Sequence, residues 1–146
     1  MTSSIFPDLN VWLALTVKNH QHHAVAETWR VQSCPSALVF CRQTQLGLFR
    51  LLSTPAIMGP RMFSQISCWK LYDHLIASGI AVFAEEPAGL ESPLRHVTKG
   101  MESSAKVWAD AYLCAFAEAA DMTLVTFDQA FASKAKQSIL LKAGRA

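Results

Sequence analysis

The chain has 146 residues, of which 16% are charged and 51% are hydrophobic. An average globular domain carries roughly 25% charged residues, so the chain is charge-poor, and this composition excludes intrinsic disorder. A formal net charge of +2 is too small to coat the surface for general nucleic-acid binding. The length fits a single domain, which we expect to span residues 1–146.

No run of apolar residues is long enough to cross a membrane, so we expect no membrane partner. Residues 1–7 lack the basic region and the apolar core of a secretory signal. These two features predict a cytoplasmic protein. The low charge also predicts an exposed apolar patch, which commonly marks a surface for a protein partner.

The hydrophobic pattern predicts strands alternating with helices. In chain order we expect a strand at 5–6, helices at 10–17 and 22–32, a strand at 37–41 and a helix over 42–52. A long helix over 60–78, a strand at 80–84 and a loop with one short helical turn over 85–100 follow. The last elements are a helix over 104–120, a strand at 123–127, a short helix over 128–136 and a strand at 138–141.

Strands separated by helices predict an α/β fold, a three-layer α/β/α sandwich with a mostly parallel sheet of four to five strands. Functional sites in such folds lie beyond the carboxyl ends of the strands. Asp8 follows the first predicted strand and Asp128 follows the fourth, so we expect both at one edge. Either aspartate could instead serve only as the N-cap of the helix that follows it.

Asp110 lies within a predicted helix, where aspartate has poor intrinsic propensity. Its neighbours one turn away are Lys106, Val107, Leu113 and Cys114, and three of these four are apolar. We therefore expect the Asp110 face of the helix to pack inward, where a lone carboxylate is costly unless it is paired or bound to metal. The alternative is an exposed ion pair with Lys106.

Three carboxylates in one cluster repel one another and need a cation to neutralise them. Carboxylate oxygens together with retained water are typical ligands of Mg²⁺ or Mn²⁺. A metal site of this kind serves the hydrolysis of phosphodiesters, because the metal activates water and neutralises the charge that grows on the phosphate. Thr126 places a hydroxyl near the same edge, two residues before Asp128.

Five segments together resemble a PIN domain and, more closely, the VapC toxins of bacterial toxin–antitoxin pairs. These segments are FPDLNVWLAL (6–15), HHAVAETW (22–29), FCRQTQLGLFRLLSTP (40–55), ADAYLCAFA (109–117) and TLVTFDQAF (123–131). The resemblance implies a Mg²⁺- or Mn²⁺-dependent endoribonuclease that acts as a toxin on structured RNA, often transfer RNA. It also implies a VapB-like antitoxin as partner and a homodimer.

The resemblance extends to individual positions of the site. Asp8, Asp110 and Asp128 match the acids that are catalytic and hold metal in the family. Asn10 and Thr126 match polar positions that line the site.

Gln45 stands where the family often has a glutamate, with Arg42 one turn earlier. A glutamine offers a carbonyl oxygen but no charge, so it could support the site, position substrate, or mark a PIN-like module that binds RNA or protein with weak or no nuclease activity. Lys18, Arg42 and Arg50 are candidate contacts for RNA phosphates. A phosphatase of the haloacid-dehalogenase type is disfavoured, because Asn10 occupies the position where that family needs a second aspartate.

Overall fold

Five parallel strands form one sheet in the order β3-β2-β1-β4-β5 in the computed structural model, which describes residues 4–34 and 36–142. The strands are β1 (Ser4–Pro7), β2 (Leu38–Phe40), β3 (Ala81–Phe83), β4 (Met122–Thr126) and β5 (Ser138–Leu140). This arrangement confirms the predicted parallel sheet. The order reverses at β1, because β2 lies on one side of it and β4 on the other.

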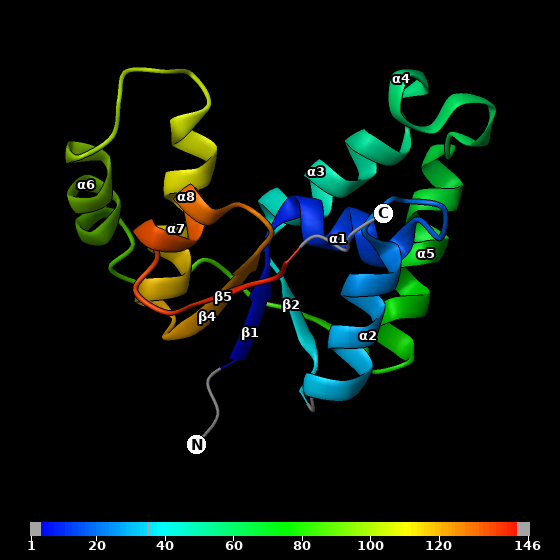
Figure 1. The fold of residues 1–146 in the computed structure, drawn as a ribbon, viewed down its shortest axis with the longest axis horizontal. Helices are drawn as coiled ribbons and strands as arrows, with labels where there is room; N and C mark the ends of the chain where they lie inside the picture. The colour runs from blue at the N-terminus through cyan, green and yellow to red at the C-terminus, as the bar shows by residue number, and fades with distance from the viewer. Residues whose placement is uncertain (1–3, 35, 143–146) are drawn as a thin grey trace.

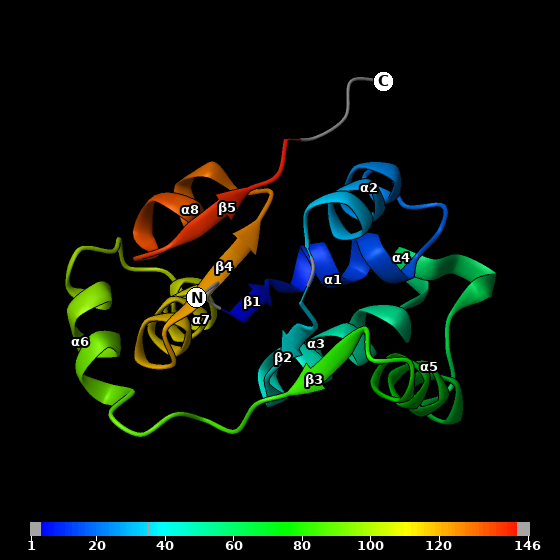
Figure 2. The same ribbon diagram turned by 90° about the horizontal axis from the view of Figure 1, so that it is seen from below.

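Helices cover both faces of the sheet, which gives the three layers that the sequence predicts (Figures 1 and 2). The helices on one side are α1 (Leu9–Thr16), α2 (His23–Ser33), α3 (Arg42–Leu52), α4 (Pro55–Met58), the 3-10 turn η1 (Gly59–Arg61) and α5 (Gln65–Ala77). The others are α6 (Glu91–Lys99), α7 (Val107–Ala119) and α8 (Gln129–Lys134). None of the described helices is long and apolar enough to cross a membrane.

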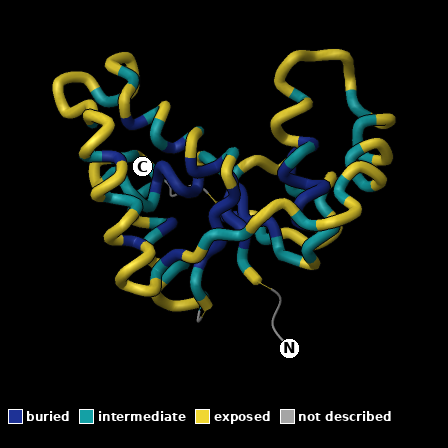
Figure 3. The backbone as a smooth tube through the Cα atoms, turned by 180° about the vertical axis from the view of Figure 1, so that it is seen from behind, coloured by how far each residue is buried: buried dark blue, intermediate teal, exposed yellow. Residues whose placement is uncertain are grey.

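Alternation along the strands divides the core between the two faces. Leu38 and Phe40 pack with α1, α3 and α5, whereas Val39, which lies between them, packs with α7. Phe6 and Leu124 are register partners on β1 and β4, and both belong to the α7 side. This is the two-residue period of a strand that is buried on both faces. Figure 3 shows the buried residues gathered at the centre, with exposed residues on the outer helices and loops.

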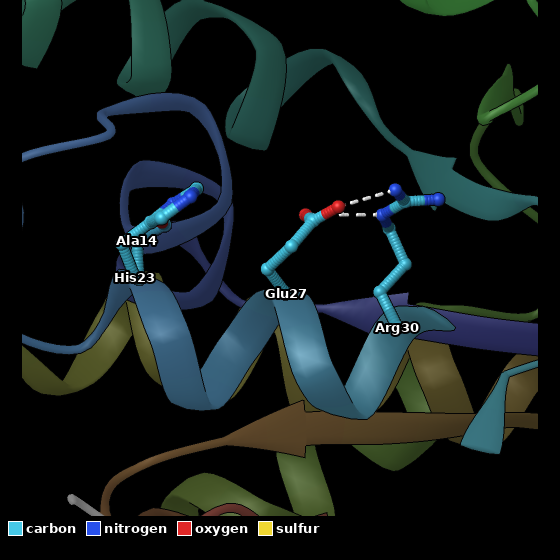
Figure 4. A network of polar contacts seen from close by, with 4 residues as sticks. All are labelled: Ala14, His23, Glu27 and Arg30. Atoms are coloured by element: carbon cyan, nitrogen blue, oxygen red, sulfur yellow. Dashed lines mark hydrogen bonds and ion pairs between the residues drawn. The ribbon is translucent and has the colours of Figure 1, made fainter. Parts of the chain in front are cut away.

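A hydrogen bond from a side chain of α2 to the backbone of α1 joins these two helices. The His23 ring donates from Nδ1 to the Ala14 carbonyl oxygen at 2.7 Å (Figure 4). One turn further along α2, Glu27 and Arg30 form an ion pair at 2.5 Å, which ties down both side chains on this face.

The helix predicted over 104–120 begins only at Val107, and two further expectations are wrong. The helix predicted over 60–78 begins at Gln65, because the Ser64 hydroxyl caps it by accepting from the Ser67 N–H at 3.1 Å. Pro60 lies in η1 instead. The segment 85–100, expected as a loop with a short turn, contains the nine-residue helix α6, which packs against α7.

Candidate active site

Asp8 and Asp128 lie at the carboxyl edge of the sheet, where the strand order reverses. Asp8 directly follows β1, and its backbone N–H donates to the Val125 carbonyl oxygen of β4 at 2.9 Å. Asp128 follows β4 after a single intervening residue. Crevices at such switch points are the usual ligand sites of open α/β sheets.

Thr126 connects the two aspartates through its hydroxyl group. The hydroxyl donates to Asp8 Oδ2 at 2.5 Å and accepts from the Asp128 backbone N–H at 3.0 Å. Each carboxylate also caps a helix, because Asp8 Oδ1 accepts from the Val11 N–H at 2.9 Å and Asp128 Oδ1 from the Phe131 N–H at 3.1 Å. Capping and membership of one polar cluster are therefore compatible for both aspartates.

The Asp8 carboxyl is buried, with an exposed fraction of 5%. Burial raises its pKa from 3.8 to about 6, against the lowering effect of hydrogen bonds from Thr126 and from the backbone of Val11 and Asn10, while Asp110 adds to the rise. No salt bridge to Asp8 is found among the described residues. The ionised form of Asp8 is therefore a buried negative charge without a cationic partner in this part of the chain.

Asp110 lies in the first turn of α7 and is exposed, so the expectation that it faces inward is wrong. The buried stretch of α7 starts only at the next residue, Ala111. Partial desolvation of its carboxyl and the charge of Asp128 raise the pKa of Asp110, and Lys134 of α8 opposes the rise. The alternative ion pair with Lys106 does not form in the described structure, where the nearby cation is Lys134.

The three aspartates influence one another electrostatically, since Asp110 raises the pKa of Asp8 and Asp128 raises the pKa of Asp110. Among residues 4–34 and 36–142, no group of three or more His, Cys, Asp or Glu side chains is placed to hold a metal ion together. Mg²⁺ does not need one, because it keeps several waters and is held through one or two carboxylates. The buried Asp8 carboxylate, which has no salt bridge among the described residues, fits such a hydrated ion.

The supporting residues take different positions. Thr126 is fully buried at the centre of the cluster. Asn10 is exposed on the first turn of α1, where its backbone N–H bonds to Asp8. Gln45 is buried on α3, and its Oε1 accepts from Arg42 Nη1 at 2.6 Å, so this oxygen already has a cationic partner.

The three basic candidates do not lie together. Arg42 and Arg50 are exposed at the two ends of α3, which begins at the carboxyl edge of β2. Lys18 follows the far end of α1 and lines a cavity of about 320 Å³ with Trp12 and Ile80. The structure therefore places Lys18 away from Asp8.

Sequence reasoning missed two residues beside the acids. Lys134 acts on Asp110 from α8, and Gln43 Nε2 donates to the Ala109 carbonyl oxygen at 3.2 Å, which joins the start of α3 to the start of α7. Both contacts cross between separate elements, so no local spacing in the sequence points to them.

Comparison with known proteins gives the family. The family model described as PIN domain matches residues 5–137. Ribonuclease VapC41 of Mycobacterium tuberculosis is 37% identical over 130 residues, which cover 85% of this chain and 88% of that protein. Ribonuclease VapC44 of the same organism is 32% identical over 127 residues, with 86% of each chain covered.

The crystal structure of Mycobacterium tuberculosis VapC20, a toxin described as cleaving the sarcin–ricin loop, has the same fold with a TM-score of 0.63 and 19% identity. The match covers 89% of this chain and 94% of that one. The fold, the position of the acids and the sequence similarity all indicate the same family. The chain belongs to the PIN-domain family and, within it, to the VapC-like ribonuclease toxins.

Proposed function

We propose that this protein is a Mg²⁺- or Mn²⁺-dependent endoribonuclease whose catalytic and metal-holding residues are Asp8, Asp110 and Asp128. The observation that carries the proposal is the hydroxyl of Thr126, which bonds both to the Asp8 carboxylate and to the backbone N–H of Asp128. The charge of Asp110 raises the pKa of Asp8, and the charge of Asp128 raises the pKa of Asp110. A buried carboxylate with a raised pKa and no described cationic partner is typical of a functional site.

The residues of the site have separate roles in this proposal. A bound divalent ion supplies positive charge for the phosphate and lowers the pKa of water. Thr126 fixes the Asp8 carboxylate, and the N-cap bond to Phe131 fixes the Asp128 carboxylate. Asp110, which is exposed, adds its carboxylate from the α7 side, and the exposed Asn10 lies next to Asp8 on the first turn of α1.

We propose structured RNA as the substrate. Two relatives are named ribonucleases, and VapC20 is described as cleaving the sarcin–ricin loop. A hairpin or loop of ribosomal or transfer RNA is therefore the substrate class that we expect here. Arg42 and Arg50 are exposed cations on α3 and are suited to contact its phosphates.

We also propose that the protein acts in the cytoplasm as the toxin of a toxin–antitoxin pair. Its relationship to VapC ribonucleases supports a VapB-like antitoxin as the partner and a homodimer as the assembly. An antitoxin segment that reaches the acidic edge would prevent RNA from entering it.

One observation favours a second candidate, a PIN-like module that binds RNA or protein and cleaves weakly or not at all. Gln45 brings no charge to the position where the family often has an acid, and its oxygen is held by Arg42. Under this reading the chain would bind RNA without divalent metal and would turn over little or none of it.

The test is cleavage of an end-labelled RNA hairpin carrying the sarcin–ricin loop sequence, in Mg²⁺ and in Mn²⁺. We expect the natural chain to cleave and both Asp8→Asn and Asp110→Asn to lose at least about a hundredfold in rate. Asp73→Asn, which changes an exposed aspartate of α5, is the matched control and should cleave normally. Equal rates in all four proteins would refute the metal-dependent nuclease.

A further inference from the structure

Gln45 is one of the few fully buried polar side chains of the described structure, with an exposed fraction of 1%. Its Oε1 accepts from Arg42 Nη1 at 2.6 Å. Its side chain also bonds to the Tyr72 hydroxyl of α5, where burial raises the pKa of the phenol while the Arg42 charge and the Gln45 bond oppose that rise. The amide is therefore engaged by two partners and is not directed at the aspartates by any described contact.

Arg42 is held in place on two sides. Gln45 binds one guanidinium nitrogen, and the guanidinium carbon lies 4.5 Å from the centre of the Phe83 ring at the end of β3. Arg42 is nevertheless exposed, and no carboxylate forms a salt bridge with it in the described part of the chain. Its remaining N–H groups are free to bind an anion, and a fixed planar fork suits a phosphate.

The location connects this arginine with the acidic edge. Arg42 is the first residue of α3, and its neighbour Gln43 donates to the carbonyl oxygen of Ala109, the residue before Asp110. The start of α3, with Arg42, therefore lies next to the start of α7, with Asp110, and one RNA strand could contact both.

The difference between an amide and a carboxylate at position 45 is decisive. A glutamate at this place would form an ion pair with Arg42 and would offset its charge. Glutamine makes the same short hydrogen bond through its carbonyl oxygen and leaves the positive charge uncompensated. Glutamine in place of glutamate thus leaves Arg42 able to bind a phosphate, besides removing a charged metal ligand at position 45.

We propose that Gln45 is a positioning residue that holds Arg42 as a phosphate-binding cation, and that it is not a weakened metal ligand. The inference rests on the proposed action on RNA, but it concerns binding of the RNA and not its hydrolysis.

The test measures binding of a fluorescein-labelled RNA hairpin in EDTA over a series of salt concentrations, with the full chain. We expect Gln45→Glu to weaken binding roughly fivefold at low salt and to reduce the slope of log K against log salt by about 0.7–0.9, the loss of one phosphate contact. Arg42→Gln should give the same loss. Adding Gln45→Glu to Arg42→Gln should then cost nothing further.

Arg50→Gln is the matched background, since Arg50 is also exposed on α3 and has no described contact with Gln45. There, Gln45→Glu should cost the same factor as in the natural chain. Gln45→Met keeps the volume without charge or hydrogen bonds, so it should weaken binding while the salt slope stays unchanged. Thermal melting of each variant verifies folding, and Gln45→Met tests the proposal even if Gln45→Glu does not fold.

Two results would overturn the inference. One is a Gln45→Glu variant that binds Mn²⁺ more tightly by calorimetry with an unchanged salt slope for RNA, as expected of a restored metal ligand. The other is an equal cost of Gln45→Glu with and without Arg42, which would indicate a general charge effect. The nuclease proposal is tested independently of RNA binding, by the cleavage assay with Asp8→Asn.

Discussion

At the scale of single residues, the site depends on the Asp8 carboxylate, whose burial lowers the stability of the folded protein. Asp8 is buried, its pKa lies at about 6, and the hydrogen bonds from Thr126 and Val11 reduce the cost without removing it. A purely structural helix cap would not need a charge here, because asparagine caps helices equally well. The retained charge is what a cation site requires.

Asp8→Asn should therefore stabilise the metal-free protein at about pH 8, by up to about 3 kcal/mol for a pKa raised by two units. Between the unfolded pKa of 3.8 and the folded pKa of about 6, the folded state binds more protons, so the natural chain loses stability as pH rises through this window. The advantage of the variant should disappear near pH 4. The check is urea unfolding in EDTA at both pH values, and a variant less stable than the natural chain at both would contradict the burial argument.

At the scale of elements, the apolar pattern predicts the sheet well, because strands buried on both faces give short apolar runs such as Leu38–Phe40. Helix starts are harder to predict. Pro60 and Ser64 are both acceptable start signals, and the hydrogen bond from Ser67 to Ser64, not visible in the sequence, decides between them. Helix α6 is short and has no fully buried residue, and the Pro, Gly and charged residues in and around it are typical of a loop.

The candidate site is predictable to the extent that it depends on strand ends. Asp8 and Asp128 follow β1 and β4, so parallel topology alone brings them to one edge. The exposure of Asp110 could not be predicted, because the apolar spacing of α7 gives the inward face but not the residue at which burial begins. The contact of Gln45 with Arg42 is a one-turn spacing that is visible in sequence, whereas its burial against α5 is not.

Helices α1 and α3 approach closely at Gly47, next to the site. A Cβ atom at this position would lie 3.0 Å from Leu9 Cδ2 and 3.2 Å from Leu9 Cδ1. Gly47→Val should cost about 1–3 kcal/mol of unfolding free energy, since the added methyl groups overpack this contact. Chemical denaturation measures this cost, and Gly100→Val, where a Cβ meets nothing within 4 Å, is the control. Equal stability of the two variants would contradict a tight α1–α3 contact.

At the scale of the whole molecule, large apolar side chains are exposed on consecutive elements from α3 to α5. They are Leu46, Ile57, Met62, Ile66 and Trp69, which we call the α3–α5 apolar surface. The rings of Phe49 and Trp69 make an edge-to-face contact, with centroids 4.9 Å apart, that joins α3 to α5 at this surface. Exposed apolar side chains of this kind are typical of a surface for a protein partner, and the homodimer proposed above would cover them.

Ile66 is the most exposed member of this surface, at 70%. Ile66→Lys should shift the purified protein from dimer to monomer in sedimentation velocity without lowering its melting temperature, because the side chain has little contact with its own fold. Val31→Lys, at a comparably exposed apolar position on α2, should leave the dimer intact. A natural chain that sediments as a monomer at high concentration would refute the dimer.

The central claim is that Asp8, Asp110 and Asp128 together hold a divalent cation, and calorimetric titration with Mn²⁺ tests it most directly. At about pH 8 the natural chain and Asp73→Asn should bind Mn²⁺, and Asp8→Asn and Asp110→Asn should bind at least about tenfold more weakly. Binding by the natural chain should also weaken at about pH 5, because Asp8, with a pKa of about 6, is then protonated and metal must displace the proton. The absence of binding at millimolar Mn²⁺ and about pH 8, or equal binding by all four proteins, would contradict the claim.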